Sequence, residues 1–178
     1  MAKNNNFVFI VLSIVAWIIF VGLCIEAGAL LVNFFISLYK PEFVQNLYQK
    51  LDLSQMYTMN KIAFFSMYSF ILGIAILKAY LFYIVIRLIH KLDLSKPFSS
   101  YVSKQITHIS YFTFTIGIIS YIASESAKNL MNHGYETEQL NRFWVDGQAF
   151  ILMAAVVYVI ATIFKKGVEL QNENDLTV

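Results

Sequence analysis

Two charged residues, Glu26 and Lys78, interrupt otherwise apolar stretches of this 178-residue sequence. A charge in the middle of a bilayer costs about 2.5–3.5 kcal/mol on insertion scales, so such residues usually face a cavity or a partner. The two residues could form an ion pair that lines a polar pocket or takes part in a relay. Their depth argues against this, because in the topology below Glu26 lies toward the outer face and Lys78 toward the inner face. At about 1.5 Å of rise per residue, we expect a separation of more than about 10 Å along the membrane normal.

Hydroxyl groups are concentrated in the third predicted helix, in its apolar stretch and directly after it: Thr107, Ser110, Thr113, Thr115, Ser120 and Ser124. They could line a path for a solute, but hydrogen bonding between helices or to their own backbone is commoner. His90, His108 and His133 are scattered, with no cysteine or carboxylate at metal-ligand spacing, and the sequence has no nucleophile elbow and no phosphate-binding glycine loop. We therefore expect a protein that is not an enzyme and that needs no metal or organic cofactor.

The elements that hold these residues follow from composition. Hydrophobic residues make up 58% of the chain and charged residues only 13%, against roughly 45–50% and 25% in soluble domains. Four apolar stretches reach or approach the roughly 20 residues that a membrane-spanning helix needs: 7–35, 62–89, 106–123 and 144–164. Since backbone amides in a bilayer must be hydrogen-bonded internally, the sequence predicts an all-α, single-domain, four-helix transmembrane bundle. A net charge of +2 does not favour direct binding of nucleic acid.

Lysine and arginine residues predict the orientation of this bundle. The side that holds both termini and the second loop carries Lys3, Arg87, Lys91, Lys96, Lys104, Lys165 and Lys166, and the other side carries Lys40, Lys50, Lys61, Lys128 and Arg142. The first group lies at helix ends and in a short loop, where the positive-inside rule has most weight. We therefore expect both termini to be cytoplasmic.

The first outer loop contains an apolar pattern. Phe43, Leu47 and Leu51 recur at four-residue spacing after Pro41, which predicts a short amphipathic helix over about 42–52. It could bind a partner or gate a ligand, but a helix that lies on lipid headgroups or caps the bundle is commoner.

Two segments on the predicted cytoplasmic side carry the most specific sequence signals. One is the loop Lys96-Pro97-Phe98-Ser99 before the third span. The other is the tail 165–178, which contains Lys-Gly-Val-Glu-Leu-Gln and ends in Glu-Asn-Asp-Leu-Thr-Val. Both resemble the bacterial domain-of-unknown-function family 2975, and the similarity covers essentially the whole chain, which departs from the common pattern mainly in its long, polar third loop. The resemblance implies a small four-helix protein of the bacterial cytoplasmic membrane. It also implies a signalling or regulatory role, because many members are encoded beside a helix-turn-helix regulator, and it supplies no catalytic residues.

Three classes of function follow from these observations. The first is a regulatory or sensory membrane protein that contacts a cytoplasmic helix-turn-helix regulator; the candidate contact residues are Lys96, Pro97, Phe98, Gly167, Glu169, Leu170, Glu173, Asp175 and Leu176. Acidic residues of the tail would attract a basic partner, whereas a solvated tail with Lys165 and Lys166 at anionic lipid is an equally good interpretation. The alternatives are a small transporter or channel subunit, including a homo-oligomeric one, and an immunity protein that meets a toxin or bacteriocin through the outer loop 124–146. We prefer the first class.

Overall fold

Four long helices dominate the computed structural model, which describes residues 2–93 and 97–175, with side chains for 7–40, 42–93 and 97–173. The described residues form five α-helices and three short 3-10 helices without a β-strand. The long helices are α1 (Ala2–Tyr39), α3 (Lys61–Lys91), α4 (Ser100–Asn132) and α5 (Gly147–Asp175), and α2 (Ser54–Met59) is short. Four helical segments are long and apolar enough to cross a membrane, which confirms the predicted all-α architecture.

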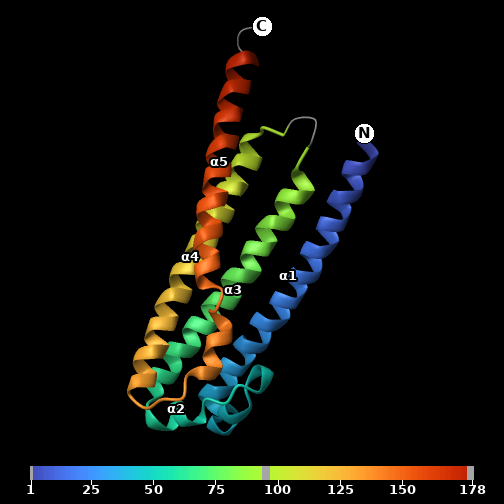
Figure 1. Cartoon of the computed structure of the whole chain (residues 1–178). Coiled ribbons are helices and arrows are strands. Elements are labelled where there is room, and N and C mark those ends of the chain that lie inside the picture. Colours follow the sequence, from blue (N-terminus) through green and yellow to red (C-terminus); the bar gives the residue numbers. More distant parts are fainter. Residues whose placement is uncertain (1, 94–96, 176–178) are drawn as a thin grey trace.

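Both ends of the chain lie at the same end of the molecule, together with the loop between α3 and α4 (Figure 1). We call this the inner end, because the distribution of lysine and arginine predicts that it faces the cytoplasm. The opposite end, which holds α2 and the loop after α4, is the outer end. The structure contains no membrane, so the orientation itself stays a prediction.

The long helices follow one another as a row rather than a closed ring. Helix α1 contacts α3, α3 contacts α4, and α4 contacts α5, while the described backbone of α1 approaches neither α4 nor α5. Figure 1 shows α1 at the edge of the row, beside α3. Among its described side chains, only Ala16, Leu30 and Ser37 are buried. Most of the surface of α1 is therefore left for lipid or for another protein.

Small residues bring α4 and α5 together. They recur at seven-residue intervals on both helices and are all buried: Ser103, Ser110 and Gly117 on α4, and Gly147, Ala154 and Ala161 on α5. The hydroxyl group of Ser110 donates a hydrogen bond to the carbonyl oxygen of Ala154 at 3.0 Å. A Cβ atom on Gly117 would lie 2.5 Å from Cγ1 of Ile151 and 3.1 Å from the carbonyl oxygen of Gly147. Close packing of small residues is a common way for membrane helices to associate.

The structure corrects the prediction of one amphipathic helix over 42–52. This segment forms two short 3-10 helices, η1 (Pro41–Asn46) and η2 (Tyr48–Lys50), and the chain then reverses so that the amide of Leu47 donates to the carbonyl oxygen of Leu51 at 3.0 Å. Gln49 has φ 57° and Lys50 φ 58°, values outside the α-helical region. The reversal buries Leu47 and Leu51 together while Phe43 stays exposed, so a turn rather than a helix produces the four-residue spacing.

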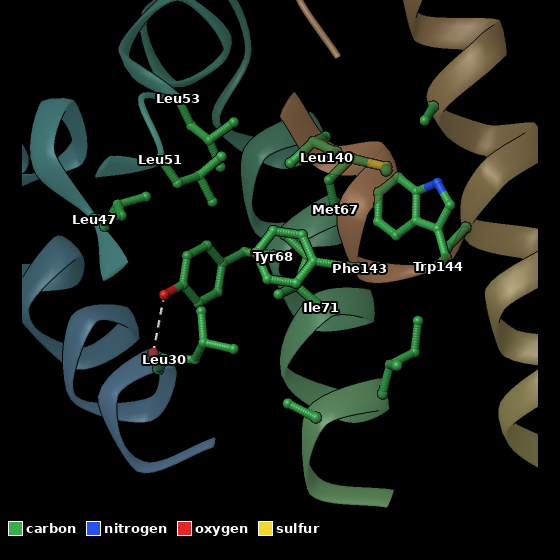
Figure 2. Packing of buried hydrophobic residues seen from close by; sticks show 14 of the residues in the cluster. Leu30, Leu47, Leu51, Leu53, Met67, Tyr68, Ile71, Leu140, Phe143 and Trp144 are labelled. Carbon is green, nitrogen blue, oxygen red and sulfur yellow. Dashed lines mark hydrogen bonds between the residues drawn. The ribbon is translucent and has the colours of Figure 1, made fainter. Parts of the chain in front are cut away.

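The largest hydrophobic cluster of the protein lies toward the outer end, where the two outer loops fold together (Figure 2). Leu47, Leu51 and Leu53 of the first outer loop pack in one cluster with Leu140, Phe143 and Trp144 of the second. Polar contacts also join the loops: the side-chain oxygen of Gln55 accepts from the amide of Glu136 at 2.9 Å, and Arg142 donates to the carbonyl oxygen of Gln49 at 3.3 Å. We call residues 41–60 and 133–146 the outer cap.

The fourth crossing is broken near the outer end. The 3-10 helix η3 (Glu138–Phe143) is followed by a turn over 144–146, and α5 begins only at Gly147. Gly147 lies against α4, where a Cβ atom would be 2.8 Å from Cβ of Ser120. Helix α5 then continues to Asp175, eleven residues past Phe164, where we expected the span to end.

Candidate functional site

The inner loop is held in place by a helix cap. Ser99 has φ −117° and ψ 148°, and its hydroxyl oxygen accepts a hydrogen bond from the amide of Val102 at 3.2 Å, so it caps the start of α4. Pro97 is half-buried two residues earlier. The cap fixes where the chain enters α4 and therefore where the preceding residue, Phe98, is directed.

Phe98 joins the two segments that carry the family resemblance. Its ring lies 5.4 Å from the ring of Phe164 on α5, measured between centroids. It also covers Gly167, where a Cβ atom would come within 2.6 Å of Cε1 of Phe98. We call Phe98, Phe164 and Gly167 the clasp. Because a side chain at residue 167 would overlap the ring, glycine is the residue that permits this contact.

A second hydrophobic cluster supports the clasp from inside the helix row. Val102, Ile106 and Ala161 are its buried members, and Phe164 and Leu92 pack against it. The clasp is therefore the exposed edge of a packed contact between the inner ends of α4 and α5.

Beyond the clasp, α5 continues as an ordered helix. We call residues 165–175 the α5 extension. Figure 1 shows it passing beyond the loop between α3 and α4. Lys166 and Glu169 form an exposed ion pair of 2.6 Å on it, while Leu170 is 60% exposed. At about 1.5 Å per residue the extension is roughly 16 Å long.

The structure places most of the predicted contact residues on this one surface. Pro97, Phe98, Gly167, Glu169, Leu170 and Glu173 all lie on the clasp, on the extension or directly beside them. Lys96 and Leu176 lie outside the described residues, as does the side chain of Asp175. The sequence identified both segments but did not show that Phe98 and Gly167 touch.

Glu26 and Lys78 are not brought together as an ion pair. Nζ of Lys78 lies 5.6 Å from the centroid of the Phe150 ring on α5, whereas Glu26 is half-buried on α1. The two residues are nevertheless closer in depth than expected. Tyr68 donates to the carbonyl oxygen of Leu30, and Phe20 contacts Tyr83, which places Glu26 opposite residues 72–77 of α3. The two residues are therefore within about 9 Å of each other along the helix axes, and the side chain of Lys78 is turned toward α5.

The hydroxyl groups of α4 bond mostly within the helix pair. Thr107 donates to the carbonyl oxygen of Ser103 and Thr115 to that of Tyr111, while Ser110 bonds across to α5. Thr113 differs, because its buried hydroxyl oxygen has no hydrogen-bond partner. This pattern gives the hydroxyl groups a role in packing, as is common in membrane helices.

The comparison with known families covers nearly the whole chain. The sequence profile of the family described as "Protein of unknown function (DUF2975)" matches residues 8–178. The chain belongs to the DUF2975 family. No curated protein and no solved structure matches the chain.

One feature of this DUF2975 protein was missed by sequence reasoning. A cavity of about 420 Å³ lies at the break in the fourth crossing, lined by residues of α4 and of the broken segment that include Ser120, Ser124, Trp144 and Gln148. Nε1 of Trp144 is buried without a hydrogen-bond partner. The apolar run Phe143-Trp144-Val145 concealed the break, although Asp146-Gly147 directly after it was a signal for a turn.

Metal chemistry finds no support in the described side chains, which contain no group of three or more His, Cys, Asp or Glu residues that could hold a metal ion. The clasp and the α5 extension offer instead an exposed apolar residue, charged groups and an ordered backbone. Such a surface can bind another macromolecule.

Proposed function

We propose that this protein is a membrane-embedded regulator whose inner surface, the clasp and the α5 extension, docks a cytoplasmic helix-turn-helix protein. The observation that carries the proposal is the contact of Phe98 with Gly167, because it joins the two family motifs into one surface. The proposal includes no catalytic step. Its setting is the cytoplasmic membrane of a bacterium, with the inner end in the cytoplasm.

The chemistry of the extension fits a basic partner. Glu169 and Glu173 are one helical turn apart, and Leu170 lies between them as an exposed apolar residue. DNA-binding proteins carry basic surfaces because they neutralise phosphates. Acidic residues around an apolar anchor would steer such a partner by complementary charge and hold it by burial of Leu170. A regulator held in this way would have part of its basic surface covered.

The helix row offers a route by which the outer end could influence this surface. Helix α5 is unbroken from Gly147, which packs on α4 near the outer cap, to Asp175 at the inner end. Packed helices change by small, discrete shifts rather than by continuous deformation. A shift of α5 along α4 would therefore move the extension relative to Phe98.

The first test is whether a helix-turn-helix protein is encoded beside this chain, since its absence would contradict the proposed partner. The purified regulator is then captured by the full-length protein in nanodiscs. We expect truncation after Phe164 and the variants Leu170→Asp and Glu173→Lys to reduce capture by tenfold or more. The pair Glu136→Lys and Glu138→Lys, exposed at the outer end, is the matched control and should capture normally. Equal capture by the wild type and the tail variants, or capture by neither, would refute docking at the extension.

Orientation has its own test. In a Cys24→Ser background, Lys166→Cys should react with a membrane-impermeant maleimide only after the cytoplasmic membrane is opened. Glu138→Cys should react in intact cells after permeabilisation of any outer membrane. The reverse pattern would overturn both the orientation and the cytoplasmic docking.

The broken fourth crossing supports a second candidate, a small transporter or channel subunit. Discontinuous membrane helices line the solute sites of many transporters, and the cavity beside Trp144 contains polar side chains from α4 and α5. This candidate predicts solute flux in reconstituted vesicles that depends on Ser120, Ser124 or Lys78. Unchanged flux in Lys78→Met and Ser120→Ala variants would exclude such a path.

A further inference from the structure

A second cavity, also of about 420 Å³, lies between α4 and α5 at the inner end. Its size falls within the range of roughly 300–1,000 Å³ that small-molecule sites occupy. Figure 1 shows the two helices side by side over this region. The polar lining comes from both helices and includes Ser100, Ser103, Lys104 and Thr107 on α4 and Lys165 on α5.

Positive charge dominates this cavity. In the described structure neither Lys104 nor Lys165 forms an ion pair. Glu169 also lines the cavity, but its carboxylate is engaged by Lys166 at 2.6 Å. Two lysines from different helices therefore face the cavity against a single carboxylate, that of Glu169, which Lys165 and Lys166 share. The hydroxyl groups of Ser100 and Ser103 lie beside them as hydrogen-bond donors. This is a binding environment for an anion with several oxygen atoms, such as a phosphate.

The position of the cavity points to the source of that phosphate. The lining runs along one face of α4 from Ser100 to Tyr111, a length of about 16 Å at 1.5 Å per residue. The uncharged stretch of α4 begins between these residues, at Ile106. The cavity therefore extends about 9 Å outside the start of the apolar span and about 8 Å inside it. The headgroup layer of one leaflet is only about 5–7 Å thick, so the cavity crosses from the headgroups into the acyl region.

The deeper end of the cavity is suited to an acyl chain. Tyr111 lines this end, is 56% exposed and contacts the half-exposed ring of Tyr158 on α5 at 6.4 Å. A soluble phosphate would use only the lysine-lined part. An amphiphile with a phosphate at one end and an acyl chain at the other would occupy the whole length.

We propose that the groove between α4 and α5 binds the phosphate headgroup of an anionic phospholipid from the inner leaflet, with Lys104 and Lys165 as its charged contacts. Basic pockets between membrane helices on the cytoplasmic side recognise such headgroups. Headgroup binding here does not depend on the docking function proposed above, since it requires no protein partner.

The test compares lipid binding by variants that remove equal charge. Purified protein in detergent is titrated with phosphatidylglycerol or phosphatidylcholine, bound lipid is counted by native mass spectrometry, and the thermal midpoint is recorded. Lys104→Gln with Lys165→Gln should weaken phosphatidylglycerol binding by about thirtyfold, as expected for two lysines beside an anionic headgroup. Arg87→Gln with Lys91→Gln removes the same charge at the same end but outside the lining of the groove, and it should change binding less than threefold. Lys104→Arg with Lys165→Arg keeps the charge and should retain binding.

Three results would overturn the assignment. Equal losses in the two glutamine pairs would mean that the inner end attracts anionic lipid without a site. Equal binding of phosphatidylcholine, which has the same phosphate but no net charge, would mean that the negative charge of the headgroup is not recognised. In a further experiment, inorganic phosphate is added without lipid. If it raises the thermal midpoint as much as phosphatidylglycerol does, the groove is a site for a soluble phosphate instead.

Discussion

The ring of Phe98, in the loop before α4, lies on Gly167 of α5 so closely that a Cβ atom at residue 167 would overlap it. This contact predicts strong coupling between the two positions. In the wild-type background, Phe98→Ala should lower the free energy of unfolding by about 1–3 kcal/mol, less than the loss of a fully buried phenylalanine would. It should cost at least about 1 kcal/mol less in a Gly167→Ala background, where the ring is already displaced. Unfolding of the four proteins in detergent measures this cycle, and additive effects would contradict the contact.

A second prediction concerns the closest approach of α4 and α5. Gly117→Ala should lower the free energy of unfolding by about 1–3 kcal/mol, because its Cβ would meet both the side chain and the backbone of Ile151. Gly28→Ala on α1 has open space around the new atom and should stabilise by about 0.5–1 kcal/mol through helix propensity. If both variants changed the free energy of unfolding in the same direction, α4 and α5 would not be in close contact at Gly117.

Replacing two hydroxyl groups on α4 should change the free energy of unfolding in opposite directions. Ser110→Ala removes the bond to the carbonyl oxygen of Ala154 and should destabilise the protein by about 1 kcal/mol. Thr113→Val replaces a fully buried hydroxyl that has no partner, so it should be neutral or stabilise by up to about 1 kcal/mol. Thermal unfolding of the two variants decides this, and a destabilised Thr113→Val would reveal a hydrogen bond at that hydroxyl.

The charges within the spans should act independently. Lys78 lies over Phe150 while Glu26 is on α1, so the cycle of Glu26→Gln and Lys78→Met should show a coupling energy below about 0.5 kcal/mol. Unfolding in detergent at neutral pH measures it. Coupling above about 1 kcal/mol would mean that the two side chains meet in the folded protein.

The four spans were predictable from the sequence because a bilayer imposes a simple rule on composition. Uncharged runs such as 106–123 can cross a membrane only as helices, and each of the four stretches contains a long helix in the structure. The inner motifs were also visible as sequence signals. Their contact was not, because it depends on the register of α4 against α5. The small residues at positions 110, 117, 147 and 154 set that register only once the two helices are known to be partners.

The outer cap resisted prediction for a different reason. The spacing of Leu47 and Leu51 fits both a helix and a tight reversal, and only tertiary packing with Leu140 and Phe143 decides between them. The break after Phe143 was hidden because an apolar run such as Phe143-Trp144-Val145 fits a membrane helix as well as a buried turn. Local pattern alone therefore predicts the crossing but not its interruption.

The row of helices has a consequence for how the protein enters the membrane during synthesis. Helix α1 has the most apolar stretch of the four and, in the described structure, contacts only one other long helix, α3, whereas α4 has the least apolar stretch. Helix α1 leaves the ribosome before the other three long helices, so it can reside in lipid as soon as it emerges, without waiting for the rest of the chain. Helix α4 needs its seam with α5 to shield Ser110 and Ser120 from hydrocarbon, so we expect the insertion machinery to release these two helices into the bilayer as a hairpin.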